Sequence, residues 1–179
     1  MYLRKHINSV IFVIDLQIIR SFKMVCKNIL TYRNRIKCSL NEIEEDIRNA
    51  IGISIKKLQI TYRVKDSGKL REKMQLKNTP DVFSIKDVYG IRIIVESVND
   101  VYFVLAKISE RFFGFLKHDY IISPKTRPNE PKFKGKMVRF LQFIAYKNGA
   151  PFEIQITTTA FHEMNESLHE EYHRRKYPT

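Results

Sequence analysis

Phe152-Glu153-Ile154-Gln155-Ile156-Thr157 is the stretch of sequence that decides the fold. Apolar and polar residues alternate along it, which predicts a strand whose phenylalanine and isoleucines face the core. Glu153 and Gln155 then project together from the opposite face. The turn-forming pair Asn148-Gly149 precedes this strand, and the apolar segment Val138–Tyr146 precedes the turn. The whole segment therefore predicts a β-hairpin.

A second apolar stretch supplies another carboxylate. It reads Asp87-Val88-Tyr89-Gly90-Ile91-Arg92-Ile93-Ile94-Val95 and predicts a buried strand with an acid at its start and an arginine among its apolar residues. Two carboxylates on neighbouring strands can hold Mg²⁺, which prefers carboxylates and substrate phosphates. We therefore expect Asp87 and Glu153 to form a metal pair. The alternative is that each is a solvated residue at the rim of the sheet.

Composition indicates one globular domain with a strong positive charge. The chain has 179 residues, 44% of them hydrophobic, and its 32 Lys and Arg against 19 Asp and Glu give a net charge of +13. A chain of this composition can build a core, so it is not a disordered tail. The charge favours an anionic partner, either nucleotide phosphates, RNA or an acidic surface. The alternative is that the charge only aids solubility.

The N-terminal part has an apolar run, Val10–Ile19, that Asp15 and Gln17 interrupt. This run is too short and too polar to cross a bilayer, so we expect an amphipathic helix that packs on the domain or on a second copy, and no membrane partner. Cys26 and Cys38 have no metal-site or disulfide spacing around them. They fit a reducing cytosol, which predicts a cytoplasmic protein. Packing of the N-terminal helix on a second copy would make a homo-oligomer.

Strand and helix patterns alternate along the rest of the chain. They predict an α+β fold, with a mixed sheet flanked by helices in a domain over 53–179 and a helical extension over 1–52. The expected helices are Asn8–Ile36, Ser39–Ala50, Ser67–Lys77, Asn99–Phe112 and Ala160–Lys176. The expected strands outside the hairpin are Leu58–Val64, Ile91–Val95 and Asp119–Ile122.

Cationic side chains flank the two carboxylates in this scheme. They are Arg63, Lys65, Lys69, Lys73, Arg92, Lys125 and Arg127. Acidic metal ligands ringed by cations are what phosphoryl transfer needs, because the metal bridges phosphate oxygens and the cations neutralise charge. No glycine-rich phosphate loop is present, so side chains and metal would hold the nucleotide. A basic RNA-binding domain with structural carboxylates has a similar pattern and stays open.

Five segments in order resemble the synthetase domain of the RelA/SpoT family, the alarmone synthetases, over about Ile60 to Tyr177. Arg63-Val64-Lys65 with Lys69 and Lys73 resembles the family's Arg-x-Lys strand and basic helix. Asp87 to Arg92 resembles its D-x-x-G-x-R segment, Asp119 to Lys125 its D-Y-I-x-x-P-K, and Glu153 to Ile156 its E-x-Q-I-R-T. The last helix, with His162, Glu166 and Lys176, resembles its M-H-x-x-A-E…Y-K tail.

This resemblance implies a nucleotidyltransferase-like fold and transfer of pyrophosphate from ATP to the ribose 3′-hydroxyl of GDP or GTP. It implies that Asp87 and Glu153 bind Mg²⁺ and that Glu153 helps to deprotonate the acceptor. The nucleotide-binding residues that it implies are Arg63, Lys65, Lys69, Lys73, Arg92, Lys125, Gln155 and His162.

The acceptor half departs from the family pattern. The N-G-Y-x-S-L-H motif, whose tyrosine stacks on the acceptor guanine, is missing from the region Thr126 to Gln142, where Phe133 or Phe140 is the available aromatic ring. The arginine of E-x-Q-I-R-T is Thr157 here. Three alternatives therefore stand beside the alarmone synthetase: pyrophosphate transfer to a tRNA 3′ end, a degenerate nucleotide-binding or RNA-binding paralogue, and a fragment whose helices serve oligomerisation.

Overall fold

The computed structural model describes residues 30–32, 34, 39, 41–124 and 137–176, and for residues 53 and 169–176 the backbone alone. Five strands form one sheet in the order β1-β2-β5-β4-β3. They are β1 (Gln59–Val64), β2 (Tyr89–Val95), β3 (Gly114–Asp119), β4 (Leu141–Lys147) and β5 (Ala150–Thr158). Only β2 and β5 pair in parallel, and the other neighbours are antiparallel. The predicted α+β fold with a mixed sheet is confirmed.

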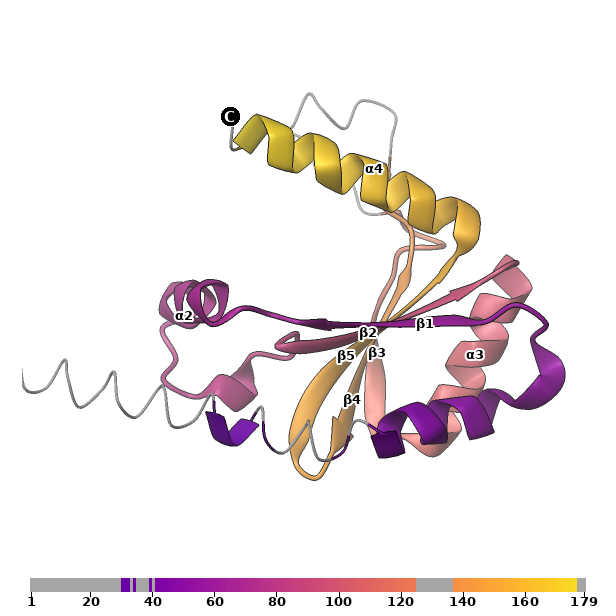
Figure 1. Cartoon of the computed structure of the whole chain (residues 1–179), viewed down its shortest axis with the longest axis horizontal. Helices are drawn as coiled ribbons and strands as arrows, with labels where there is room; N and C mark the ends of the chain where they lie inside the picture. Colours follow the sequence, from indigo (N-terminus) through magenta and orange to yellow (C-terminus); the bar gives the residue numbers. More distant parts are fainter. Residues whose placement is uncertain (1–29, 33, 35–38, 40, 125–136, 177–179) are drawn as a thin grey trace, which may run out of the picture.

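Helices cover both faces of this sheet. Figure 1 shows α3 (Val98–Arg111) and the helical segment 41–51 below the sheet, α4 (Thr159–Lys176) above it, and α2 (Ser67–Leu76) at one end. Short 3₁₀ turns follow the first helical segment at Gly52–Ser54 and precede β2 at Val82–Ser84.

The apolar core lies on the lower face. Ile43, Ile47 and Ile51 recur at every fourth residue of the first helical segment and are buried, as are the isoleucines of β2 and β5. This spacing places the three side chains on one helical face, which packs against the sheet. The division of the chain at residue 52 stays a prediction, although the segment just before it shares the core of the sheet.

The hairpin is confirmed, with its first strand displaced from the predicted Val138–Tyr146 to Leu141–Lys147. Asn148 and Gly149 have positive φ angles of 52° and 73°, as the two central residues of a type I′ turn do. Because the turn holds two residues, Lys147 pairs with Ala150 and the register of the whole hairpin is fixed. This register places Gln142 directly opposite Gln155.

The predicted strand Asp119–Ile122 is wrong. The strand is Gly114–Asp119, and the chain turns after it, because the Asp119 carboxylate accepts the backbone N–H groups of Ile121 and Ile122 at 2.9 and 3.0 Å. Because β3 lies at the edge of the sheet, its side chains are mostly exposed. Its sequence therefore lacks the alternation of apolar and polar residues that would predict a strand. The third helix begins earlier than predicted, with Ser97 and Asp100 forming a capping box.

The helix predicted over Asn8–Ile36 lies mostly outside the described residues. Residues 30–32 and 34, which belong to its end, are helical. The Tyr32 hydroxyl donates a hydrogen bond to the carbonyl of Pro151, at the start of β5. The homo-oligomer expected from this segment stays a prediction.

Candidate functional site

Strand register brings the polar residues of four strands into two adjacent rows. Thr61, Arg92, Gln155 and Gln142 form one row across β1, β2, β5 and β4. Arg63, Gly90 and Glu153 form the next row. Paired residues on neighbouring strands project to the same face of a sheet. The row residues therefore share the face opposite the apolar core.

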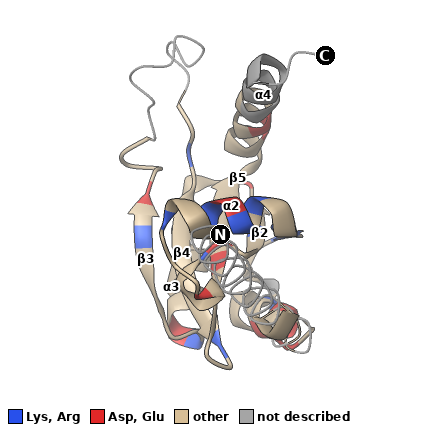
Figure 2. Cartoon of the chain, turned by 90° about the vertical axis from the view of Figure 1, so that its left-hand side faces the viewer, with Lys and Arg blue, Asp and Glu red and all other residues tan. Residues whose placement is uncertain are grey.

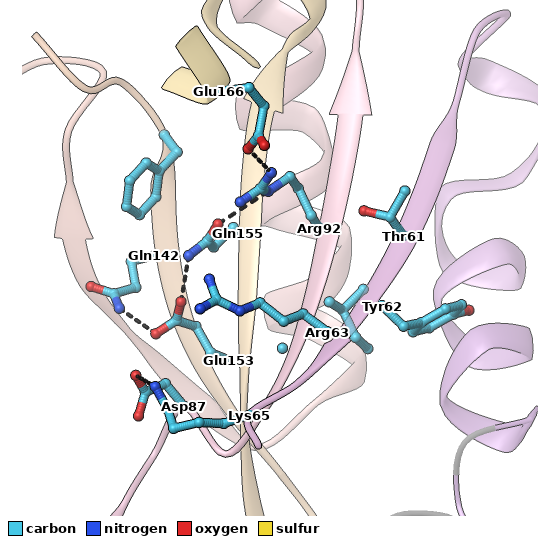
Figure 3. Close-up of a pocket in the computed structure, with 13 residues that line it drawn as sticks. Thr61, Tyr62, Arg63, Lys65, Asp87, Arg92, Gln142, Glu153, Gln155 and Glu166 are labelled. Carbon is cyan, nitrogen blue, oxygen red and sulfur yellow. Dashed lines mark hydrogen bonds and ion pairs between the residues drawn. The ribbon is translucent and has the colours of Figure 1, made fainter. Parts of the chain in front are cut away.

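A pocket of about 710 Å³ lies on this face (Figure 3). It contains both predicted metal ligands, three of the predicted cations and the predicted Gln155. The residues that line it are Thr61, Tyr62, Arg63, Lys65, Asp87, Gly90, Ile91, Arg92, Phe140, Gln142, Glu153, Gln155 and Glu166. Strands far apart in the sequence thus bring Asp87 and Glu153 to one cavity.

Asp87 is a half-buried anion held by two lysines. Its Oδ2 lies 3.0 Å from Nζ of Lys65 and 2.6 Å from Nζ of Lys73. Burial disfavours the charged carboxylate, but the hydrogen bonds from Lys73 and Lys65 outweigh it and hold the pKa of Asp87 below its ordinary value. Asp87 is therefore ionised at neutral pH. Lys65 comes directly after β1 and Lys73 lies on α2, which carries several basic residues (blue in Figure 2).

Glu153 is buried in the middle of β5 and is only 6% exposed, so the alternative of a solvated residue at the rim of the sheet is wrong for it. Each of its carboxylate oxygens accepts one side-chain amide: Oε2 from Gln142, and Oε1 from Gln155 at 2.6 Å. Both donors are neutral. No described cation is hydrogen-bonded to this carboxylate, in contrast to Asp87, so Glu153 keeps an uncompensated negative charge in the pocket.

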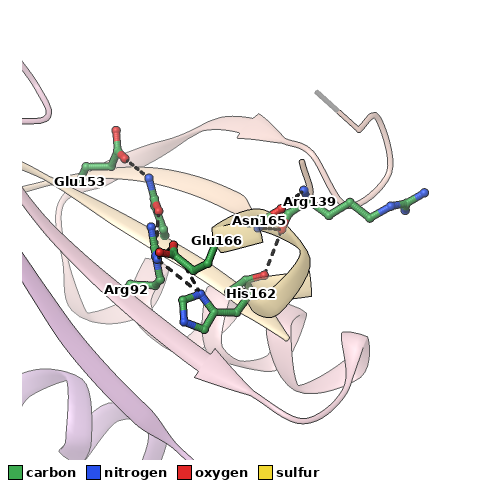
Figure 4. Close-up of polar contacts among 8 residues, drawn as sticks. Arg92, Arg139, Glu153, His162, Asn165 and Glu166 are labelled. Atoms are coloured by element: carbon green, nitrogen blue, oxygen red, sulfur yellow. Dashed lines mark hydrogen bonds and ion pairs between the residues drawn. The ribbon is translucent and has the colours of Figure 1, made fainter. Parts of the chain in front are cut away.

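Arg92 joins the pocket to α4 (Figure 4). Its Nε donates to Oε1 of Gln155 at 3.2 Å, and its Nη1 donates to Oε1 of Glu166 at 2.6 Å. The same Nη1 lies 3.4 Å from Nδ1 of His162. The predicted His162 therefore lies beside Arg92 but does not line the pocket. Its nucleotide-binding role stays a prediction.

The remaining predicted cations differ in their surroundings. Arg63 lines the pocket, and its side chain makes no hydrogen bond or ion pair with any other described residue. Lys69 is exposed on the first turn of α2, where its backbone N–H donates to the cap residue Asp66, and it lies outside the pocket lining. Lys125 and Arg127 lie outside the described residues.

The donor chemistry of the site fits Mg²⁺. Oδ1 of Asp87 is buried without a hydrogen-bond partner, so this oxygen keeps free acceptor capacity beside the pocket. A cluster of three or more metal-ligating side chains does not occur in the described part of the chain. Two carboxylates with substrate phosphates are a ligand set that Mg²⁺ commonly uses. A metal here would therefore depend on a phosphate-bearing ligand to complete its coordination.

Sequence reasoning missed two residues of the site, Gln142 and the pocket position of Tyr62. The signal for Gln142 was available, since a two-residue turn at Asn148-Gly149 fixes it opposite Gln155. Phe140, named as a possible stacking residue, lines the pocket, and its ring packs edge-to-face on Tyr120 with centroids 5.2 Å apart. Phe133 lies outside the described residues.

Comparisons with known proteins agree with this geometry. Residues 62–177 match the family model described as the region found in RelA / SpoT proteins. Small alarmone synthetase 2 from Bacillus subtilis is 22% identical, with a TM-score of 0.60 over 84% of this chain and 80% of that one. Small alarmone synthetase 1 from the same organism is 23% identical, with a TM-score of 0.56 over 83% and 77%.

A further structure, of small alarmone synthetase 1 from Bacillus subtilis bound to its product pppGpp, is 20% identical, with a TM-score of 0.54 over 83% of this chain and 80% of that one. At these identities the solved structures show a shared fold. A search of curated proteins by sequence finds no match. In the described part of the chain, no helix combines the length and apolarity needed to cross a membrane.

Proposed function

Because the chain belongs to the family of RelA and SpoT proteins, we propose that it is a pyrophosphokinase that transfers pyrophosphate from ATP to the 3′-hydroxyl of GDP or GTP. The observation that carries this proposal is the position of Asp87 and Glu153. Asp87 lies just before β2, Glu153 lies on β5, which pairs with β2 in parallel, and both line one pocket with Arg63, Lys65 and Arg92 around them. Acids that hold a metal beside cations that bind phosphates are the equipment of phosphoryl transfer.

The proposed reaction is a displacement at phosphorus. The acceptor 3′-oxygen bonds to the β-phosphorus of ATP, the bond from that phosphorus to the oxygen bridging to the α-phosphorus breaks, and AMP leaves. The proton of the 3′-hydroxyl passes to the carboxylate of Glu153. This carboxylate suits the role, since its two hydrogen bonds come from neutral amides and leave its negative charge uncompensated.

The side chains proposed to bind phosphate differ in whether they must first give up a contact within the protein. Arg63 has no described partner, so it can meet an incoming phosphate without losing a contact. Lys65 and Lys73 are held by Asp87, and each must exchange that carboxylate for phosphate oxygens. Lys69, Lys125, Gln155 and His162 complete the proposed nucleotide-binding set. Asp87 and Glu153 would hold the Mg²⁺ that neutralises charge on the transferred phosphates.

Incubation with ATP labelled at the γ-phosphate, Mg²⁺ and either GDP, GTP or bulk tRNA tests the proposal. We expect label on GDP or GTP and equal release of AMP. Label on the tRNA 3′ end would favour the alternative acceptor. The net charge of +13 is consistent with that acceptor, because cationic side chains bind the phosphates of nucleic acids. ATP binding without transfer to any of the three would contradict the pyrophosphokinase and favour a degenerate nucleotide-binding protein.

A further inference from the structure

We infer that Glu166 on α4 is a positioning residue, which orients the carboxylate of Glu153 through Arg92 and Gln155. The inference rests on the proposed function, because Glu153 is the carboxylate that would accept the proton of the 3′-hydroxyl. It concerns a residue that lies at the edge of the same pocket. Figure 3 shows the four side chains in a continuous line from Glu166 to Glu153.

The chain of contacts has a fixed direction. Glu166 accepts from Arg92 Nη1 at 2.6 Å, Arg92 Nε donates to Gln155 Oε1 at 3.2 Å, and Gln155 Nε2 donates to Glu153 at 2.6 Å. A glutamine amide has one oxygen and one NH₂ group. Because Arg92 occupies the oxygen, the NH₂ group must point to Glu153. Without the arginine, the amide can rotate and present its oxygen to the carboxylate instead.

Glu166 in turn decides where the guanidinium lies. Arg92 sits opposite Thr61 and Gln155 in the register, and neither partner carries a charge. Among the described residues, Glu166 is the one acid that is ion-paired with Arg92. The guanidinium is a planar fork, so holding its Nη1 also fixes its Nε. Loss of the Glu166 charge should therefore free the guanidinium to turn toward Glu153, an acid in the adjacent row to which no described cation is hydrogen-bonded.

The role of Glu166 can be separated from simple anchoring of α4. Asn165 ties the same helix turn to the chain just before β4: its Oδ1 accepts the backbone N–H of Arg139 at 3.1 Å, and its Nδ2 donates to the Arg139 carbonyl at 2.9 Å. The Thr157 hydroxyl donates to that carbonyl at 3.0 Å. Removing the Glu166 charge leaves these contacts in place, so α4 should stay docked.

Glu166→Gln, with Glu163→Gln as its matched control, tests the inference. Glu163 is an exposed acid on the same helix, outside the pocket lining. In Glu166→Gln we expect kcat to fall by about 10- to 100-fold, which is typical when a residue that orients a functional side chain is lost. The KM for ATP should stay within about twofold of the parent value. Arg92→Lys, which keeps the charge but loses the fork, should show the same loss. Glu163→Gln should match the parent protein.

A spectroscopic readout keeps this test independent of activity. In NMR spectra of the ¹⁵N-labelled protein, the side-chain NH₂ signals of Gln155 should move in Glu166→Gln, while the backbone signal of Arg139 stays, which reports that α4 is docked. If the parent protein transfers no pyrophosphate but these signals behave as expected, the positioning role stands and the proposed function fails. Unchanged Gln155 signals, full activity in Arg92→Lys, or a moved Arg139 signal would overturn the inference.

Discussion

Gly90 pairs with Glu153 across the parallel strands β2 and β5, and on its other side it pairs with Arg63. The central position of that row therefore carries no side chain. A Cβ built at Gly90 would meet only the carbonyl oxygens of Arg63 and Glu153, at 3.8 and 3.9 Å, which is ordinary contact. The glycine thus keeps the floor of the pocket open between an unpaired guanidinium and a buried carboxylate.

Gly90→Val should fill this floor and weaken nucleotide binding, whereas Gly90→Ala should weaken it less. Because a Cβ at this position makes only ordinary contacts, Gly90→Ala should fold, and circular dichroism should show that Gly90→Val is folded before its affinity is measured. The affinity for a non-hydrolysable ATP analogue, measured by calorimetry, should fall by at least about tenfold in Gly90→Val, roughly the 1.4 kcal/mol of one lost contact. Equal affinity in the valine variant would mean that ligand does not occupy this part of the pocket.

Glu153→Gln should abolish pyrophosphate transfer. The substitution removes the proton acceptor, and loss of a general base costs about 10²- to 10⁴-fold in rate. It also turns an amide toward the NH₂ groups of Gln142 and Gln155, so we expect a loss of about 1–3 kcal/mol in the free energy of unfolding. Circular dichroism should still show a folded protein. A rate within threefold of the parent would remove Glu153 from the chemistry.

Asp87 should make the stability of the protein depend on acid pH. Its pKa is lowered in the folded state, so its contribution is complete above the ordinary aspartate pKa of about 4 and is lost as the pH falls through the folded pKa. Asp87→Asn leaves Lys65 and Lys73 facing each other without an anion. Urea unfolding should show the variant to be less stable by about 1–3 kcal/mol at pH 7.

The same comparison carries its own control. The difference in unfolding free energy between the parent and Asp87→Asn should shrink steadily below about pH 4, because the parent loses the ionised carboxylate there. Other acids of the protein titrate equally in both proteins and cancel from the difference. A difference that is constant from pH 7 to pH 3 would show that the two lysines do not depend on the charge of Asp87.

Gly114→Ala should destabilise the fold at the edge of the sheet. A Cβ at this position would lie 2.2 Å from the Ile144 carbonyl and 2.6 Å from the Phe143 ring, so strands β3 and β4 would have to separate. Forcing atoms into such contacts costs about 1–3 kcal/mol. Thermal unfolding should show a lower midpoint for Gly114→Ala than for Gly90→Ala, the matched glycine whose Cβ has room. Equal midpoints would contradict the close packing of β3 on β4.

The sequence predicted those parts of the fold that local patterns specify. Alternation over Phe152–Thr157 predicted β5 and the outward direction of Glu153, and Asn148-Gly149 predicted the hairpin, although its register was not worked out from the sequence. It failed at β3, an edge strand whose exposed residues follow no burial pattern, and there Asp119 begins a turn. Its start for α3 was late because Ser97, not Asn99-Asp100, is the cap residue.

The two acids of the site could be predicted from the sequence, but the contacts around them could not. Asp87 and Glu153 follow from strand patterns, but their hydrogen-bond partners depend on tertiary placement. That Lys65 and Lys73 both contact Asp87 follows from the placement of α2, which the buried Leu70 and Met74 anchor in the apolar core. The contact of Glu166 with Arg92 needs the angle at which α4 leaves β5. No periodicity in the sequence specifies that angle.

The parallel pairing of β2 with β5 also has a consequence for synthesis on the ribosome. Strand β5 and the helix after it are translated after β2 and β4, so a nascent chain that ends at β4 contains Asp87 but neither Glu153 nor Glu166. Such a chain also leaves one edge of β2 unpaired in the middle of the future sheet. Catalytic competence should therefore arise abruptly, only when β5 and α4 have left the exit tunnel.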